Sequence, residues 1–362
     1  MLEWFARNAR DLPWRRTRDP YAIWVSEIML QQTQVSTVIP FWERWMRALP
    51  TINSLARATP GKIHKLWEGL GYYTRVRNLQ TAARVIVEEH RGEFPRVFEH
   101  VLALPGIGRY TAGAICSIAF DQPRPILDGN VIRVLSRACG IEGDPRDKAT
   151  NTKLWELAEQ LVREAGSSIL RERSLSATSP PPLRCSHFNQ SLMELGALVC
   201  TPRHPKCGVC PIAKRCFARK HGRAEALPNL APRPRTTRRR FVAFVARRGA
   251  KVLVLQRPTG VVNAHLWEFP NIEVRNSDGD VPEAARQVLG AAPSDLRLLC
   301  TIRHSITRYR IRLDVFQTAS DQSYKPAQPL GQWLNTAQLR RLAFASAHKK
   351  VLSRLELRRN PK

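Results

Sequence analysis

The stretch Leu104-Pro-Gly-Ile-Gly-Arg-Tyr-Thr-Ala-Gly-Ala-Ile115 predicts two helices joined by a tight turn. Pro105 ends the incoming helix, and Gly106 and Gly108 lack the Cβ atoms that would hold a neighbouring group away from the turn. The backbone amides at the start of the next helix, around Arg109–Thr111, have no partner within that helix and can bind a phosphate. An ordinary helical hairpin with a glycine-rich corner has the same pattern, so this stretch alone leaves both interpretations open.

A second motif, Ile126-Leu-Asp-Gly-Asn-Val-Ile-Arg133, predicts the start of a further helix. Asp128 follows an apolar pair of residues and precedes Gly129 and Asn130. A carboxylate at such a place is either a helix N-cap or a catalytic group, and one residue can be both.

Glu27 lies inside an apolar sequence, in a helix predicted from Pro20 to Gln34. The apolar residues on both sides of it give that helix a buried face. A lone glutamate is more often on the surface, so the position by itself does not distinguish a chemical role from a structural one. The helix ends in Gln31-Gln-Thr-Gln34, an unusual cluster of amide side chains.

The chain has 362 residues, which is too long for one ordinary domain and predicts two or three. Its 58 Lys and Arg against 30 Asp and Glu give a net charge of +28, which favours a polyanionic partner and nucleic acid first. The sequence contains no apolar run long enough to span a membrane. It begins in an amphipathic pattern without a basic and apolar leader, so we expect a cytoplasmic protein. We also expect it to be nucleoid-associated and monomeric.

Four of the eight cysteines fall within the short segment Cys200-x6-Cys207-x2-Cys210-x5-Cys216. Disulfides are not expected in a cytoplasmic protein, so a metal site is the natural interpretation. Four thiolates suit either an all-cysteine zinc site or an iron–sulfur cluster. Zinc modules usually have two Cys-x2-Cys pairs, whereas this segment has one such pair with longer flanks, and that difference favours iron–sulfur.

Composition divides the chain into three parts. Residues 1–221 are predicted to form an all-α domain, residues 222–240 a linker rich in proline and arginine, and residues 241–362 an α+β domain. The Ser-, Arg- and Pro-rich segment 167–186 is expected to be an exposed insertion. The predicted strands of the last part are Phe241–Ala246, Lys251–Gln256, Leu266–Pro270, Leu296–Thr301 and Tyr309–Phe316, and its predicted helices are Val281–Leu289 and Thr336–Leu355.

Six motifs, taken in order, resemble the MutY-type adenine DNA glycosylases of the helix-hairpin-helix, endonuclease III-like superfamily over nearly the whole chain. They are Leu12-Pro-Trp-Arg15, Ser26-Glu-Ile-Met-Leu-Gln-Gln-Thr33, Gly69-Leu-Gly-Tyr-Tyr73, Leu104-Pro-Gly-Ile-Gly108, Leu127-Asp-Gly-Asn-Val131 and the four-cysteine segment. The resemblance implies a multidomain protein. An all-α glycosylase domain with the hairpin near 104–115 and an iron–sulfur loop at 200–216 precedes a Nudix-like, α+β lesion-recognition domain.

Enzymes of this family act in base excision repair on double-stranded DNA and remove adenine mispaired with 8-oxoguanine or with guanine. The adenine must first be flipped out of the stack. The resemblance implies that Glu27 is the acid that protonates the adenine, with a pKa raised by its apolar neighbours. It implies that Asp128, kept ionised, stabilises the oxocarbenium-like sugar, as one of two carboxylates with separate roles. Tyr110 and Asn130 match residues that orient these carboxylates.

The resemblance also implies DNA contacts and a cofactor. Gln32 and Tyr72 match residues that wedge into the duplex, Trp14 matches one that lines the adenine pocket, and Gly106 and Gly108 belong to the DNA-binding hairpin. Cys200, Cys207, Cys210 and Cys216 match the ligands of a [4Fe–4S] cluster. Its first role is expected to be structural, because glycosylase chemistry transfers no electron.

Position 110 separates a monofunctional glycosylase from the nearest alternative. Endonuclease III-like relatives that are also AP lyases have a lysine there as the Schiff-base nucleophile, whereas this chain has Tyr110. A bifunctional glycosylase and lyase, a non-catalytic iron–sulfur DNA-binding protein and a nucleotide hydrolase remain the alternatives. Both carboxylates are present, which weighs against a binding protein, and Pro282–Leu289 has one glutamate where a Nudix hydrolase needs an acidic helix.

The loop that reaches 8-oxoguanine in many bacterial relatives contains Phe-Ser-His, and Ile306-Thr307-Arg308 aligns with that triplet. Thr307 keeps a hydroxyl group and Arg308 keeps a hydrogen-bond donor, but the aromatic ring and the imidazole are missing. A preference for 8-oxoguanine over guanine therefore does not follow from the resemblance.

Overall fold

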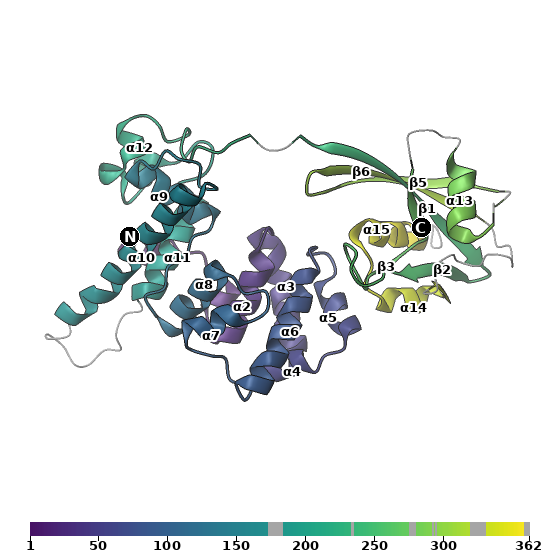
Figure 1. The fold of residues 1–362 in the computed structure, drawn as a ribbon, viewed down its shortest axis with the longest axis horizontal. Coiled ribbons are helices and arrows are strands. Elements are labelled where there is room, and N and C mark those ends of the chain that lie inside the picture. Colours follow the sequence, from purple (N-terminus) through teal and green to yellow (C-terminus); the bar gives the residue numbers. More distant parts are fainter. Residues whose placement is uncertain are drawn as a thin grey trace. The chain divides into compact units, whose positions relative to one another are not determined.

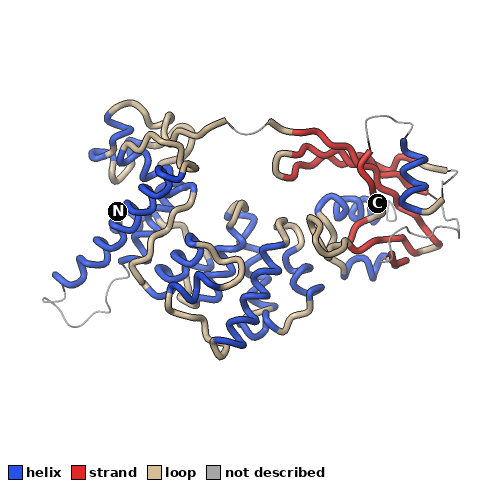
Figure 2. Tube along the Cα trace, viewed as in Figure 1, coloured by secondary structure: helices blue, strands red, loops and turns tan. Residues whose placement is uncertain are grey.

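The computed structural model describes residues 1–172, 184–232, 235–274, 280–291, 293, 295–318 and 331–357. The chain forms two compact units (Figure 1). The first contains Met1–Arg57 and Arg77–Pro232, and its regular elements are helices throughout the described residues. The second contains Ala58–Val76 and Arg233–Lys362 and holds the strands, drawn red in Figure 2. The predicted fold class, an all-α part followed by an α+β part, is confirmed.

The described residues of the first unit form α-helices and short 3-10 helices. They are α1 (Leu2–Asn8), the 3-10 helix η1 (Pro13–Arg15), α2 (Pro20–Leu30), α3 (Val35–Ala48), α4 (Ile52–Ala56), α6 (Thr74–Glu89), which begins in the second unit, α7 (Phe98–Ala103), α8 (Arg109–Phe120), α9 (Gly129–Cys139), α10 (Lys148–Glu172), α11 (Arg184–Leu198), the 3-10 helices η2 (Cys207–Val209) and η3 (Ala213–Arg215), and α12 (Phe217–Lys220). No helix in the described ranges is both long and apolar enough to span a membrane.

Helix α2 is buried along most of its length. Pro20 is its first residue, and the Asp19 side chain caps it by accepting a hydrogen bond from the backbone N–H of Tyr21. Every side chain from Tyr21 to Met29 is buried, and Glu27 is 6% exposed. A helix that is apolar on all sides belongs to a core. The surface interpretation of Glu27 is therefore excluded.

The predicted hairpin is formed by α7 and α8. Gly106 has a φ of +77°, a conformation that favours glycine, and a Cβ atom there would lie 2.6 Å from the Cβ of Asn78. Gly108 is the N-cap of α8. Within α8, a Cβ on Gly113 would lie 2.1 Å from the carbonyl oxygen of Pro125. The missing Cβ lets the segment that leads to Asp128 pack directly against α8.

The prediction for segment 167–186 needs correction at both ends. Helix α10 continues to Glu172, and α11 already begins at Arg184. Cys185 and Ser186 are each only 2% exposed. The composition of this segment concealed both helix ends, and at the start of α11 the burial of Cys185 and Ser186 outweighs a weak local preference. The remainder, 173–183, lies outside the described residues.

In its described residues, the second unit is built on one mixed sheet of seven strands with the order β3-β2-β1-β6-β5, in which β4 also pairs with β1 and β7 with β2. Strands β1 and β6 are parallel, and the other pairs are antiparallel. The strands are β1 (Thr237–Arg248), β2 (Lys251–Gln256), β3 (Trp267–Glu268), β4 (Asn271–Val274), β5 (Arg297–Ile306), β6 (Tyr309–Thr318) and β7 (Gly331–Leu334). Strand β1 therefore begins inside the predicted linker 222–240.

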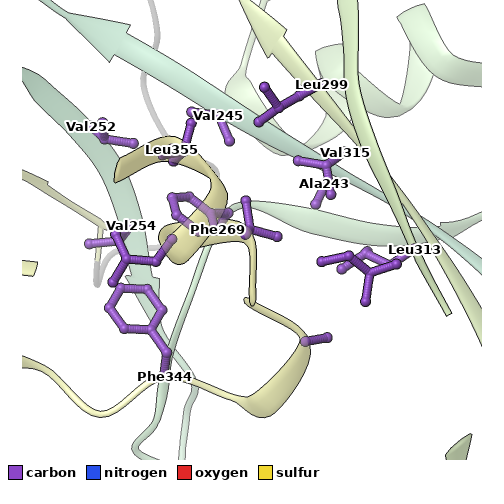
Figure 3. Close-up of a cluster of buried hydrophobic side chains, with 14 of the residues drawn as sticks. Ala243, Val245, Val252, Val254, Phe269, Leu299, Leu313, Val315, Phe344 and Leu355 are labelled. Carbon is purple, nitrogen blue, oxygen red and sulfur yellow. The ribbon is translucent and has the colours of Figure 1, made fainter. Parts of the chain in front are cut away.

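Helices cover both faces of this sheet. On one face Val254, Phe269 and Val315 pack with Phe344 and Leu355 (Figure 3). These two residues belong to the segment that contains α14 (Thr336–Arg341) and α15 (Ser346–Leu357). On the other face the buried cluster includes residues of β1 and of α13 (Asp280–Leu289). The result is a sheet between two helical layers.

The predicted single helix Thr336–Leu355 is wrong, because the chain forms two helices with a break between them. At the break the backbone N–H of Trp267 donates to the carbonyl oxygen of Ala343, and the N–H of Ala345 donates to that of Trp267. Phe344 is fully buried. The apolar residues keep a helical period across the break, so the sequence pattern does not show it. The break becomes visible in the pairing of Trp267 in β3 with the segment around Phe344.

The segment Ala58–Val76, which contains α5 (Pro60–Trp67), is joined to the C-terminal part of the second unit through Glu68. The Glu68 carboxylate is 5% exposed and accepts hydrogen bonds from the backbone N–H of Phe344 at 2.8 Å, from Lys65 at 2.9 Å and from Lys349 at 2.8 Å. These bonds lower the pKa of Glu68 although burial opposes this. An ionised carboxylate thus fixes this segment against α15.

Candidate active site

Two carboxyl groups from different helices meet in one cleft of the first unit. The cleft has a volume of about 550 Å³ and is lined by Glu27 from α2, Tyr110 from α8, and Asp128 and Asn130 from the start of α9. Trp14 and Gln32 line the same cleft. The structure thus brings together all four residues predicted to be catalytic and two of those predicted to contact DNA.

Burial dominates the electrostatics of Glu27. It raises the pKa of this carboxyl to about 7, and the nearby Asp128 acts in the same direction. The Tyr110 hydroxyl donates a hydrogen bond to Oε2 of Glu27 at 2.8 Å, which favours the ionised form and partly opposes the rise. The pKa of Tyr110 is itself raised well above its usual value, so Tyr110 remains a donor. Glu27 can therefore hold a proton near neutral pH.

Asp128 has a different set of partners in the same cleft. Burial raises its pKa, but hydrogen bonds from the protein act against burial. Its Oδ1 accepts from the backbone N–H of Val131 at 2.7 Å, and its Oδ2 accepts from the Asn130 amide at 2.9 Å. Each oxygen of Asp128 thus has a donor, whereas within the described residues the Glu27 carboxyl accepts from Tyr110 alone. Asp128 is therefore the N-cap of α9, and its donors favour the ionised form against the effect of burial.

A third buried carboxylate, Glu194 of α11, escaped the sequence analysis. Burial alone would raise its pKa, but Arg10 and Arg15 donate to it and lower its pKa to about 2. Arg10 Nε lies 2.8 Å from Oε1, and Arg15 Nη2 lies 2.9 Å from Oε2. All three residues line the cleft. The signal was the one that singled out Glu27, namely a glutamate inside an apolar helix.

The other predicted DNA-contacting residues lie outside this cleft. Gly106 and Gly108 form the turn between α7 and α8. Tyr72 is 47% exposed and belongs to the second unit, as do Thr307 and Arg308, which form the turn between β5 and β6. Gly106 and Gly108 thus belong to the first unit, and Tyr72, Thr307 and Arg308 belong to the second.

Three of the residues predicted to contact DNA have a positive backbone φ angle. Gln32, Tyr72 and Thr307 have φ values of +56°, +46° and +50°, a region that residues with a side chain rarely adopt. Such conformations gather at functional sites, where the surrounding structure holds them.

The four cysteines of the loop line one small cavity together with Val134, Leu195 and Val199. Arg137 of α9 donates through Nη1 to Cys200 Sγ at 3.4 Å, so it is an outer-shell partner of one of the four cysteines. Within the described residues, no set of three or more His, Cys, Asp or Glu side chains converges as ligands of a single metal ion. Four cysteines around one apolar cavity match the ligand number of an iron–sulfur cluster.

Arg133 connects this loop to the cleft. Its Nε donates to the carbonyl oxygen of Cys200 at 2.7 Å, and its Nη2 donates to Oδ1 of Asn130 at 2.8 Å. Asn130 in turn holds Asp128. The approach of α9 to α11 depends on Gly196, since a Cβ there would lie 2.6 Å from that of Asn130. Neither Arg133 nor Gly196 was identified from the sequence.

Comparisons with known proteins agree with this geometry. Residues 25–160 match the HhH-GPD superfamily of base excision DNA repair proteins, and residues 242–354 match the NUDIX domain. Residues 200–216 match the iron–sulfur binding domain of endonuclease III, which confirms the predicted [4Fe–4S] cluster on the four cysteines' loop. When bound, such a cluster supplies the link that holds the loop together.

Two curated relatives cover almost the whole chain. The adenine DNA glycosylase of Rattus norvegicus is 37% identical over 97% of this chain and 76% of its own length, and that of Homo sapiens is 36% identical over 97% and 72%. A solved thermostable thymine-DNA glycosylase is 31% identical, with a TM-score of 0.51 over 61% of this chain and 93% of its own. The chain belongs to the adenine DNA glycosylase family and is a DNA N-glycosylase of base excision repair.

Proposed function

We propose that the substrate is adenine mispaired with 8-oxoguanine or with guanine in double-stranded DNA, and that the enzyme is monofunctional. The observation that carries this proposal is the pair Glu27 and Asp128. Both lie in one cleft, and their different hydrogen-bond donors separate their protonation states. The relatives' name supports adenine as the base that is removed.

In this mechanism Glu27 acts as the general acid. It transfers its proton to a ring nitrogen of the flipped adenine, which converts a poor leaving group into a better one. The bond between the sugar C1′ and the base then breaks, and its electron pair leaves with the adenine. A pKa of about 7 allows Glu27 to hold that proton near neutral pH and to release it.

Asp128 stabilises the positive charge that develops on the sugar as this bond breaks. The donors Val131 and Asn130 keep its carboxylate ionised and oriented. Water then adds to C1′ and gives its proton back to Glu27, which restores the acid and leaves an abasic site. Tyr110 and Arg133 act as positioning residues, through Glu27 and Asn130 respectively.

The cleft supports base removal without strand cleavage. A lyase of this superfamily needs an amine to form a Schiff base with the sugar. Among the described residues, those that line the cleft include no lysine, and Tyr110 hydrogen-bonds to Glu27.

For the opposite strand, we assign Thr307 and Arg308 to contact with the base that faces the adenine. Gln32 and Tyr72 are assigned as wedges that hold the duplex open. The positive φ values of Gln32, Tyr72 and Thr307 support these roles, because exposed turns held in such conformations are rigid platforms for a contacting side chain.

A panel of duplexes tests the proposed substrate. Adenine is placed opposite 8-oxoguanine, guanine or thymine, and single-turnover base release is measured with and without hot alkali. The proposal predicts nicks only after alkali, with adenine opposite 8-oxoguanine or guanine cleaved and adenine opposite thymine left intact. Equal release opposite thymine would overturn the mispair requirement, and nicking without alkali would favour the lyase alternative.

A further inference from the structure

Strands β1, β6 and β5 lie side by side and extend together toward the turn at Thr307 and Arg308 (Figure 1). Arg238 and Arg240 of β1 pair with Arg310 and Arg312 of β6, and Arg312 also pairs with Arg303 of β5. Residues paired in this way point to the same face of a sheet. These five arginines, Arg238, Arg240, Arg303, Arg310 and Arg312, therefore share one face of the ribbon, called here the arginine face.

The arginine face points away from the core that lies against α15. Phe241, Ile302 and Leu313 are the next residues along the chain to Arg240, Arg303 and Arg312, so they point to the opposite face, and they pack into that core. Further along β1 the arginine-face side continues with Val242 and Phe244, which pack with α13. Arg238, Arg303, Arg310 and Arg312 are exposed. The sheet thus runs on beyond its helical cover and presents arginine there.

The positive charge on this face is only partly compensated. Asp314, which is 1% exposed, accepts hydrogen bonds from Arg240 Nε at 3.0 Å and Arg312 Nε at 2.9 Å. In the part of the chain that the structure describes, no hydrogen bond or ion pair involves the side chains of the other three arginines of the face.

Like charges placed directly opposite each other destabilise a sheet. The pairing of Arg238 with Arg310, and of Arg303 with Arg312, therefore costs stability in the free protein. An anion with regularly spaced charges would reverse that cost, since guanidinium groups bind phosphate through two parallel hydrogen bonds. The paired guanidinium groups therefore indicate a binding surface for such an anion rather than a merely solvated surface.

The dimensions of the face fit a nucleic-acid backbone. Strands lie about 4.8 Å apart, so the three strands span about 10 Å, and alternate residues along a strand lie about 7 Å apart. One strand of B-DNA presents a phosphate about every 3.4 Å along its axis. The arginine face can therefore meet about three phosphates.

We propose that the arginine face binds the phosphate backbone of duplex DNA and anchors the second unit on the substrate independently of any base. The proposal rests on the proposed function only in taking duplex DNA as the substrate. It adds a face for about three phosphates, with Arg238, Arg303 and Arg310 uncompensated on it, to a domain otherwise assigned to contact with a single base.

The test replaces the three uncompensated arginines in the full chain, as Arg238→Gln, Arg303→Gln and Arg310→Gln together. Binding to an undamaged duplex is measured by fluorescence anisotropy at several salt concentrations. Each lost phosphate contact lowers the slope of log affinity against log salt by about 0.9, so the triple variant should lose about 2.7. The single variant Arg310→Gln should lose about 0.9 and gives the same test if the triple variant unfolds.

Two matched variants distinguish the face from overall charge. The combination Lys251→Gln, Arg286→Gln and Arg341→Gln removes the same charge from exposed positions at the start of β2, on α13 and on α14. This control should lower the slope of log affinity against log salt by much less than the triple variant of the arginine face does. The combination Arg238→Lys, Arg303→Lys and Arg310→Lys keeps the charge and should keep most of the slope.

An unchanged slope in the glutamine variants overturns the proposal, as does an equal loss in the Lys251, Arg286 and Arg341 variant. The latter result would show a diffuse charge effect, and the former would show that the arginine face does not contact the DNA phosphates. Release of adenine by the unsubstituted chain is measured in parallel on mispaired duplexes. Failure of that reaction would contradict the proposed substrate and leave the salt slope as an independent result.

Discussion

At the scale of the residue, the chemistry depends on giving two carboxyl groups in one cleft different protonation states. Burial raises the pKa of both Glu27 and Asp128. Hydrogen bonds then distinguish them, because both oxygens of Asp128 have donors whereas Glu27 receives the one from Tyr110. The acid and the charged stabiliser follow from these surroundings and not from residue type.

This arrangement predicts the pH dependence of base release. Glu27 must be protonated to act, and it loses its proton as the pH rises through about 7. The single-turnover rate should therefore decrease above that pH, approaching about tenfold for each further pH unit. At low pH the rate should decrease again as Asp128 becomes protonated. A rate that stays level from pH 6 to pH 9 would remove Glu27 as the acid.

Tyr110→Phe tests the hydrogen bond that opposes burial at Glu27. Because the Tyr110 hydroxyl lowers the pKa of Glu27, its removal should raise that pKa and move the decreasing limb of the pH profile to higher pH. The matched control Tyr309→Phe changes a tyrosine of the second unit and should leave the limb in place. A shift toward lower pH in Tyr110→Phe would be inconsistent with the assigned direction of this bond.

At the scale of the element, helix α9 joins the reaction site to the cysteine loop. Asp128 caps its first turn, and Arg133 and Arg137, one turn apart, both donate to the loop that begins at Cys200. The loop's structure is thereby linked to the orientation of Asn130. The cluster can support catalysis in this way without any transfer of electrons.

Arg133→Gln is expected to reduce base release by about 10- to 100-fold, a usual effect of losing an outer-shell partner. The variant should retain the visible absorbance of the iron–sulfur cluster, because the cysteines and Arg137 are unchanged. The exposed Arg163 of α10 offers a control, as Arg163→Gln, which should leave both properties unchanged. Equal activity of Arg133→Gln and the unsubstituted chain would mean that Asn130 needs no support from Arg133.

Elements whose signals are local could be predicted from the sequence, and those that depend on distant partners could not. The turn at Gly106 and the cap at Asp128 are encoded within a few residues. Glu194 depends on Arg10, which lies 184 positions away in the sequence. The break between α14 and α15 depends on pairing of Trp267 with the segment around Phe344.

The active-site residues could be predicted only from the resemblance to a known family, because the site also depends on residues distant in the sequence. Glu27, Tyr110 and Asp128 lie far apart in the sequence, so no local pattern brings them together. The structure places them around one cleft because α2 is buried and because Gly113 admits the segment that leads to Asp128.

At the scale of the whole molecule, the chain has two compact units whose boundary does not follow the order of the sequence. Residues 58–76 interrupt the helical part and belong to the unit that contains the sheet. Glu68 in that segment accepts hydrogen bonds from Phe344 and Lys349. The exposed Tyr72 follows Glu68 on the same segment, which gives the loop that carries it a fixed support.

Glu68→Gln should loosen this attachment. Loss of the charged acceptor should weaken bonds from Lys65, Lys349 and the Phe344 N–H, at a cost of about 1–3 kcal/mol, and speed hydrogen exchange of the Phe344 amide. Because the folded pKa of Glu68 is lowered, its stabilisation is present above the usual value of 4.5 and decreases as the pH falls below it. Unaltered protection of Phe344 at neutral pH would show that Glu68 does not hold this segment.

Single-turnover release of adenine opposite 8-oxoguanine by Glu27→Gln tests the central claim most directly. The exposed Glu43 supplies the control, as Glu43→Gln. The account predicts a loss of base release of about 10²- to 10⁴-fold in Glu27→Gln, with duplex binding retained and the control unaffected. Release by Glu27→Gln at the rate of the unsubstituted chain would contradict the account, because an amide cannot supply the proton.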